Sequence, residues 1–353
     1  MGHNVKRRTV LGGTLSAPLI IGRRANAAER SITVGIYTGQ QGDVVRKQII
    51  PPFEAARNCK VYTTQGVTLE QIALMRTTRN NPKYSVMFVD DIGVELAKRE
   101  GLIEKLPREQ IPNLERVLNR FVFFDGYGAA FAMSAAGLCY NTATGKPLAS
   151  YGDLWDPRLR SRFLMESPKA TQSIDLLIAA VSVITGKPYS ETQYLIDQAW
   201  PKMEALKPNV LSIYESQTTV MQVADGQADI AGIFYSKSVY PYAVKGAPVD
   251  MCYPREGAFA GINCVSLVKN APDRELGLAF INHMLDPGIQ RLLAEETLTA
   301  PSISGLEFKP DVAKYMAYPE SKMEEMAIFS PDWTFINPMR SKLLEKYNEI
   351  FGA

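Results

Sequence analysis

Residues 31–45 read SITVGIYTGQQGDVV, and the prediction of the fold starts from this segment. Residues 31–37 alternate apolar with small or polar side chains, a pattern typical of a strand. A loop with two glycines is expected over residues 38–43, and a helix over residues 44–56. Further strands are expected at residues 60–62 and 84–89, and further helices at residues 69–77 and 92–100. Strands that alternate with helices predict an α/β fold with a parallel sheet.

The carboxyl ends of these strands carry polar side chains. In open parallel sheets, ligands bind beyond the carboxyl ends of the strands. Tyr37, Thr38 and Gln40 follow the first strand, and Asp90 and Asp91 follow the third. These five residues are candidates for a ligand site, although an aspartate before a helix can also serve only as its cap.

A second α/β pattern begins after residue 141, as expected for a chain of 353 residues. A mixed strand pair at residues 121–124 and 131–140 comes before it. The second pattern has strands expected at residues 163–165, 210–214 and 230–234, and helices at residues 174–185, 194–206 and 218–225. A strand at residues 264–268, helices at residues 272–285 and 290–296, and a tail helix at residues 339–351 follow.

The N-terminus reads as a targeting segment. Arg7 and Arg8 precede a weakly apolar run at residues 10–21, and Ala-Asn-Ala occupies residues 25–27. This pattern is typical of a twin-arginine export signal cleaved after Ala27. The run is too short to cross a bilayer, which takes about 20 residues. We therefore expect residues 1–27 to be removed and the mature protein to be periplasmic; a membrane anchor or a basic tail are the alternatives.

Cleavage would change the charge of the protein. Residues 1–27 carry five basic residues and no acidic ones, so their removal turns a net charge of +2 into −3. The apparent basicity of the chain therefore belongs to the signal. Nucleic-acid binding, which needs a basic patch on the folded domain, is not expected.

Cysteine and histidine usage argues against a metal site or a cofactor. The cysteines occur singly, without metal-ligand spacing, and the two histidines cannot complete a site. The periplasm permits disulfides; a Cys252–Cys264 bridge is the first expectation, and buried free thiols are the alternative. The four cysteines are Cys59, Cys139, Cys252 and Cys264, and the two histidines are His3 and His283.

No nucleophile elbow, phosphate loop or metalloprotease motif is present in the sequence, so an enzyme is not expected.

Several segments, in order, resemble the spermidine/putrescine-binding branch of the solute-binding proteins of ABC importers. The resemblance covers roughly residues 31–350. It is carried by residues 89–106, 137–141, 151–164, 224–230, 253–257, 270–272, 275–287 and 300–301.

This resemblance implies a type II periplasmic-binding-protein fold, with a ligand cleft between two lobes. Lobe one would comprise residues 28–140 plus 265–330, lobe two residues 141–264, and a C-terminal tail helix residues 331–353. It also implies a small-molecule solute and a permease at the inner membrane as partners, and we expect a monomer.

The chain departs from the polyamine binders at the positions that would hold the ligand. That branch holds amines with acids and tryptophans, whereas residues 166–173 here supply a lysine and hydroxyls at a helix start, which favour an anion. Phe234 and Tyr235 stand where a tryptophan is expected, and residues 261–263 replace a tryptophan–x–aspartate pattern.

Asp90 and Asp91, in the other lobe, favour an ammonium group. Together with residues 166–173 they favour a zwitterion or a polar organic anion, such as an amino acid conjugate or an aminophosphonate. Polyamine binding is the alternative, and ferric-ion binding through Tyr235, Tyr240 and Tyr242 is a weaker one.

Aromatic residues after the apolar strands complete the predicted site, either as walls of the cleft or as core residues. The full predicted ligand-binding set is Tyr37, Thr38, Gln40, Asp90, Asp91, Tyr127, Lys169, Thr171, Gln172, Ser173, Tyr214, Phe234, Tyr235 and Asn263.

Overall fold

The computed structural model describes residues 1–2, 30–214 and 219–352. The described strands form one sheet in the order β2-β1-β3-β11-β6-β9-β7-β8, with β4, β5 and β10 attached to β11 and β6. The strands are β1 (Arg30–Ile36), β2 (Cys59–Gln65), β3 (Val86–Asp90), β4 (Ile103–Glu104), β5 (Val122–Phe123), β6 (Gly128–Asn141), β7 (Phe163–Glu166), β8 (Val210–Tyr214), β9 (Ile230–Tyr235), β10 (Val249–Cys252) and β11 (Phe259–Val268).

The helices alternate with these strands much as the sequence predicts. They are α1 (Gly39–Val44), α2 (Ile50–Arg57), α3 (Thr68–Thr77), α4 (Asp91–Arg99), α5 (Gln172–Thr185), α6 (Tyr189–Thr192), α7 (Trp200–Leu206), α8 (Thr219–Ala224), α9 (Ser236–Val244), α10 (Arg274–Met284), α11 (Pro287–Thr297), α12 (Pro310–Ala313), α13 (Glu320–Glu325), α14 (Trp333–Ile336) and α15 (Arg340–Phe351). The loop predicted over residues 38–43 is wrong, because α1 begins at Gly39. A π-helical segment (Val45–Ile49) joins α1 to α2.

The sheet has two parallel halves joined by long antiparallel strands. β1 pairs in parallel with β2 and β3, and β7 pairs in parallel with β8 and β9. Between them lie β6 and β11, which pair antiparallel with each other. β6 is 14 residues long and buried along almost its whole length, so it passes from one half to the other through the interior.

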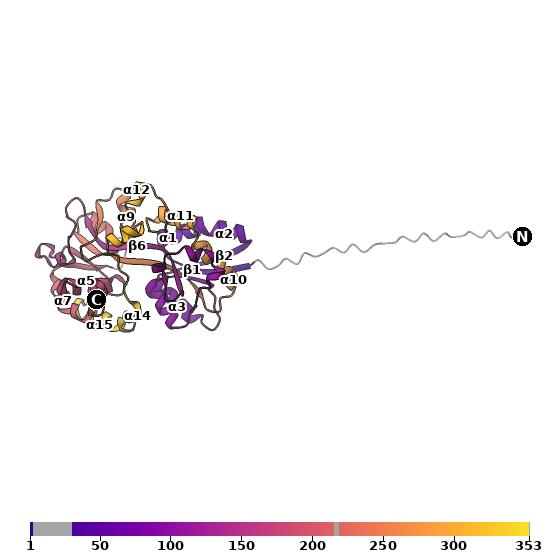
Figure 1. Ribbon diagram of the computed structural model, residues 1–353, viewed down its shortest axis with the longest axis horizontal. Helices are drawn as coiled ribbons and strands as arrows, with labels where there is room; N and C mark the ends of the chain where they lie inside the picture. The colour runs from indigo at the N-terminus through magenta and orange to yellow at the C-terminus, as the bar shows by residue number, and fades with distance from the viewer. Residues whose placement is uncertain (3–29, 215–218, 353) are drawn as a thin grey trace.

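The hydrophobic core divides along the same line. One large group of buried side chains includes Phe88, Phe131 and Phe280, and a second includes Phe163 and Trp333. In Figure 1 the indigo elements α2, β1, β2 and α3 lie on one side and α5 and α7 on the other, with β6 between them. We propose that these groups are the cores of the two predicted lobes.

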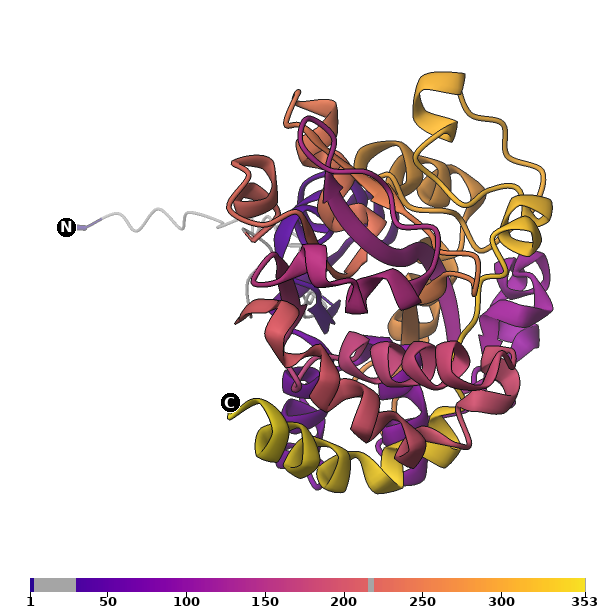
Figure 2. The same cartoon turned by 90° about the vertical axis from the view of Figure 1, so that its left-hand side faces the viewer.

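The C-terminal segment packs against the second half. Trp333 and Tyr347 belong to its core group, and the Tyr347 hydroxyl donates to the carbonyl of Ser173 at 2.6 Å. Figure 2 shows the yellow helix α15 lying beside the helices of that half. The same segment also reaches the first half, because Asn337 Nδ2 donates to the carbonyl of Ile92 at 3.2 Å. It therefore touches both halves of the molecule.

The predicted Cys252–Cys264 bridge is wrong, since all four cysteines are free thiols and all are buried. Both residues pair with β6, Cys252 opposite Leu138 and Cys264 opposite Ala130. At about 3.3 Å per residue, these positions lie roughly 25 Å apart, whereas a disulfide needs Cα atoms within about 7 Å.

We expect a thiol reagent to leave the native protein unmodified and to label all four cysteines after unfolding. Burial raises the pKa of each thiol, to about 11 at Cys252, so that little reactive thiolate forms at neutral pH. Titration with a chromogenic disulfide, with and without guanidinium, measures both states. Fewer than four thiols in the unfolded, unreduced protein would show that a disulfide exists.

The predicted export signal, with Arg7, Arg8 and the cleavage site after Ala27, lies outside the described residues. Among the helices of the described part, none has both the length and the apolar character that crossing a membrane requires.

Candidate ligand-binding cleft

A cavity of about 500 Å³ opens where strands of both halves end. Tyr37 follows β1, Asp90 ends β3 and Tyr235 ends β9, while Asn263 lies on the connecting strand β11. The cavity is lined by Tyr37, Thr38, Gly39, Gln40, Gln41, Val67, Thr68, Asp90, Tyr235, Lys237, Ser238, Pro241, Tyr242, Lys245, Asn263 and Thr297. Six of the predicted residues therefore lie together: Tyr37, Thr38, Gln40, Asp90, Tyr235 and Asn263.

A hydrogen-bond network centred on Asn263 holds the floor of this cavity. Asn263 Nδ2 donates to Asp90 Oδ1 at 3.1 Å, and the Tyr37 hydroxyl donates to the same oxygen at 2.8 Å. Asn263 Oδ1 accepts from Gln41 Nε2 at 3.2 Å and from Lys237 Nζ at 2.8 Å. The network joins the first half, the connecting strand and the second half, so the positions of these side chains depend on one another.

Lys237 brings a positive charge into the cavity from α9. Its Nζ lies 5.6 Å from the centre of the Tyr37 ring and 5.7 Å from the centre of the Tyr235 ring. Both distances are within the range of a cation–π interaction. The half-buried ammonium is therefore held between two aromatic faces and the amide oxygen of Asn263.

Burial sets the ionisation of the groups around this ammonium. It raises the pKa of Tyr37 well above its usual value, with the negative charge of Asp90 adding to the shift. It raises the pKa of Tyr235 in the same direction. Both phenols therefore stay protonated at neutral pH. Burial lowers the pKa of Lys237, and the carboxylate of Asp90 opposes that shift.

Asp91 does not line the cavity. Its side chain is buried, where Oδ2 accepts hydrogen bonds from Ser330 Oγ at 2.6 Å and from Trp333 Nε1 at 2.8 Å. The partners belong to the C-terminal segment, whose packing against α4 the local sequence around Asp91 does not reveal. Desolvation raises the pKa of Asp91 to about 6. We propose that Asp91 stabilises the fold and is not part of the ligand site.

The predicted anion-binding helix start is also outside the cavity. Lys169 lines a different hollow of about 660 Å³ beside α15, and its carbonyl accepts from Arg340 at 2.7 Å. The Ser173 hydroxyl donates to the carbonyls of Pro168 and Ala170. Gln172 is buried and Thr171 is half-buried at the start of α5. The α15 residue Arg340 therefore packs on the backbone of this helix start, and the Ser173 hydroxyl bonds lie within the turn itself.

Three predicted aromatic walls lie elsewhere. Phe234 is fully buried, and Tyr214 stacks on it with ring centres 4.8 Å apart. Tyr127 lies in the turn before β6, with Lys98 Nζ 5.1 Å from its ring centre. Since successive residues of a strand point to opposite faces, Tyr235 can line the cavity while Phe234 enters the core.

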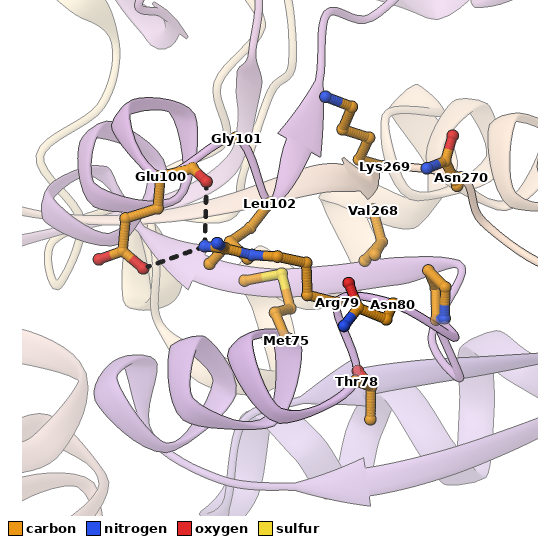
Figure 3. Close-up of a pocket in the computed structure, with 11 residues that line it drawn as sticks. Met75, Thr78, Arg79, Asn80, Glu100, Gly101, Leu102, Val268, Lys269 and Asn270 are labelled. Atoms are coloured by element: carbon orange, nitrogen blue, oxygen red, sulfur yellow. Dashed lines mark hydrogen bonds and ion pairs between the residues drawn. The ribbon is translucent and has the colours of Figure 1, made fainter.

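Another cavity, of about 360 Å³, lies at the far end of the first half (Figure 3). It is formed where α3, α4 and β11 end, and Arg79 donates to the carbonyl of Glu100 at 3.1 Å across it. β11 runs antiparallel to β3, so this end is opposite to the carboxyl ends of β1 and β3. We therefore do not assign the ligand site to it.

Several lining residues are absent from the predicted set, and Lys237 is the most consequential. It comes two residues after Tyr235, just beyond the carboxyl end of β9. The strand-end rule that selected Tyr37 and Asp90 would have selected it too. Gln41 falls in the segment whose sequence predicts a loop, and its burial follows from the earlier start of α1.

Two halves joined by long strands, with a polar cavity where parallel strands end, define the type II two-lobe binding fold. Solved structures share it. The chain superposes on an ABC transporter substrate-binding protein from Bradyrhizobium japonicum with a TM-score of 0.78, at 20% identity over 91% of this chain and 99% of the other. For AfuA of Actinobacillus pleuropneumoniae, a periplasmic binding protein, the TM-score is 0.73 at 18% identity, covering 92% and 99%.

The chain belongs to the family of bacterial extracellular solute-binding proteins, whose model matches residues 48–320. Among curated relatives, spermidine/putrescine-binding periplasmic protein 1 of Haemophilus influenzae is 26% identical over 271 residues, which cover 74% of this chain and 72% of the relative. The family and the fold expected from the sequence resemblance are confirmed.

Proposed function

We propose that this protein is the periplasmic solute-binding component of an ABC importer and delivers its solute to a permease at the inner membrane. In its cleft it binds a small zwitterion or organic anion with a carboxylate or phosphate group. The ammonium of Lys237 inside the cavity is the observation that carries this class. Its positive charge attracts a negatively charged group of the solute at short range.

The geometry around Lys237 suits an anion. An ammonium has three N–H donors, and among the described residues Lys237 makes one hydrogen bond, to Asn263. The remaining donors can serve a carboxylate or phosphate oxygen. Tyr235 and Tyr242 offer rings for the body of the solute. The structure of AfuA with bound fructose-6-phosphate shows that this fold can hold an organic phosphate.

Polyamine binding is the second candidate, supported by Asp90 and by the name of the Haemophilus relative. It is weaker because the Asp90 carboxylate already accepts from Tyr37 and Asn263 and has Lys237 nearby.

Ferric binding through three tyrosines lacks support. Tyr235 and Tyr242 line the cavity, but the Tyr240 hydroxyl lies 3.4 Å from that of Tyr253 in a buried position. We propose binding without turnover.

A screen by thermal shift is expected to find an organic acid or phosphate that stabilises the protein. At 100 times the Kd, a ligand raises the free energy of unfolding by about 2.7 kcal/mol. The panel should hold sugar phosphates, amino acid conjugates, aminophosphonates, amino acids and polyamines, and native mass spectrometry of the protein from its host adds any solute that copurifies.

Lys237→Met should weaken binding of the stabilising compound at least tenfold, because it removes the charge and keeps most of the apolar stem. Lys269→Met is the matched control, since Lys269 is an exposed lysine at the distant cavity of Figure 3. Stabilisation by polyamines alone would reject the anion and favour the second candidate.

A further inference from the structure

The cage around Lys237 has the composition of a binding site for an ammonium ion. Two tyrosine rings lie 5.6 and 5.7 Å from Nζ, and the oxygen of Asn263 lies at 2.8 Å. Aromatic faces with a nearby oxygen acceptor recognise amine cations in general. In this protein the cation that fills the cage is part of the chain itself.

We propose that Lys237 is a specificity-determining residue that excludes amines, because its own ammonium occupies the subsite between Tyr37 and Tyr235 that a solute amine would otherwise enter. This inference rests on the proposed function of the cavity. It narrows the solute class from zwitterion or anion to anion.

The three elements that form the cage come from different parts of the fold. Tyr37 follows β1 in the first half, Asn263 lies on β11, and Tyr235 with Lys237 belongs to the second half. The Asp90 carboxylate is tied to this cage through Asn263 and Tyr37. The cage therefore already holds one positive charge, that of Lys237, near the carboxylate of Asp90. A second ammonium would meet this like charge at close range.

Removing the lysine side chain should leave the cage intact and empty. Tyr37 would still donate to Asp90, and Asn263 would still bond to Asp90 and to Gln41. The negative charge of Asp90 would then have lost its nearby cation, while the rings and the amide oxygen would remain. A diamine could place one ammonium in the vacated position.

The test is binding of putrescine to Lys237→Ala, measured by calorimetry. We expect affinity at least tenfold above that of the natural protein, and a thermal shift with n-butylammonium, which replaces the deleted side chain. Lys245→Ala is the matched control, since it removes a positive charge from the exposed rim of the same cavity without opening the cage. It should show no such gain.

Lys237→Ser is the second variant if Lys237→Ala unfolds; it is short and uncharged, and it leaves the subsite between Tyr37 and Tyr235 open. A folded variant of either kind that binds putrescine no better than the natural protein would overturn the inference. An equal gain in Lys245→Ala would overturn it too, because net charge alone would then explain the result. The thermal-shift screen of the natural protein is a separate experiment. If no anion stabilises the protein, the proposed solute class is rejected, whereas the putrescine result with the Lys237 variants still decides whether Lys237 excludes amines.

Discussion

Asp91→Ala is expected to lower the free energy of unfolding by about 2–4 kcal/mol at pH 7. The substitution leaves the buried Trp333 Nε1 without its acceptor and removes the bond from Ser330. A buried polar group that loses its partner costs about 1–3 kcal/mol. Because these bonds tie α4 to the C-terminal segment, the loss should appear in urea unfolding as a lower midpoint.

Asp91→Asn separates the hydrogen bonds from the charge. Its amide oxygen can still accept from Trp333, so the loss should be smaller than with alanine. Asp125→Ala, which removes the exposed partner of Lys98, is the surface control and should change stability little. A loss with Asp91→Ala no greater than with the surface control would show that the link to the C-terminal segment is unimportant.

The two Asp91 variants also predict a dependence on pH. Asp91 has a pKa of about 6 in the folded protein, against about 3.9 when unfolded. Between these values the folded state binds the proton more tightly, so the contribution of Asp91 to the free energy of unfolding falls as the pH rises. The advantage of the natural protein over Asp91→Asn should thus shrink by about 2 kcal/mol between pH 4 and pH 7. A constant difference would contradict the raised pKa.

Periodicity was enough to predict most of the elements. The strands β1 and β9 and the helices α3 and α4 begin and end within about two residues of their predicted limits, because each has a buried face. The limits of β8 are also predicted, although only Tyr214 in it is buried. The loop at residues 38–43 failed because its glycines and glutamines carry little apolar pattern. Gln41 and Gly42 are nevertheless buried on α1, where no periodic signal marks them.

The candidate site was predictable only where one rule applied. Residues at the carboxyl ends of the parallel strands β1 and β3 meet in the cavity. The carboxyl end of β9, which runs in the opposite direction, faces them from the second half. The sequence could not show which of two neighbouring aspartates would face it, since that depends on Trp333, which lies more than two hundred residues away along the chain. Lys169 and Ser173, whose backbone carbonyls accept hydrogen bonds from α15, lie outside the lining of this cavity.

Gly261 makes room for Tyr235, and its replacement tests the shape of the cavity. Gly261 lies on β11 opposite Ser134 of β6, and Tyr235 lies on β9 opposite Ala136 of the same strand. The Tyr235 ring therefore reaches across β6 to Gly261. A Cβ atom on Gly261 would come within 2.4 Å of two ring carbons, closer than real contacts allow, so the ring or the strand must shift.

Gly261→Ala is expected to weaken binding of the anion found by the screen at least tenfold and to lower the free energy of unfolding by about 1–3 kcal/mol, the usual range for an overpacked site. The affinity should fall by more than the loss of stability explains, because the displaced ring is a wall of the cavity and one face of the cage around Lys237. Gly128→Ala is the matched control, since its Cβ would press on Val94 within 2.8 Å in the core of the first half. It should destabilise the protein to a similar degree and leave the Kd unchanged.

In the double variant Gly261→Ala/Tyr235→Leu, the smaller side chain should restore stability but not affinity. Recovery of both would mean that the Tyr235 ring plays no part in holding the solute.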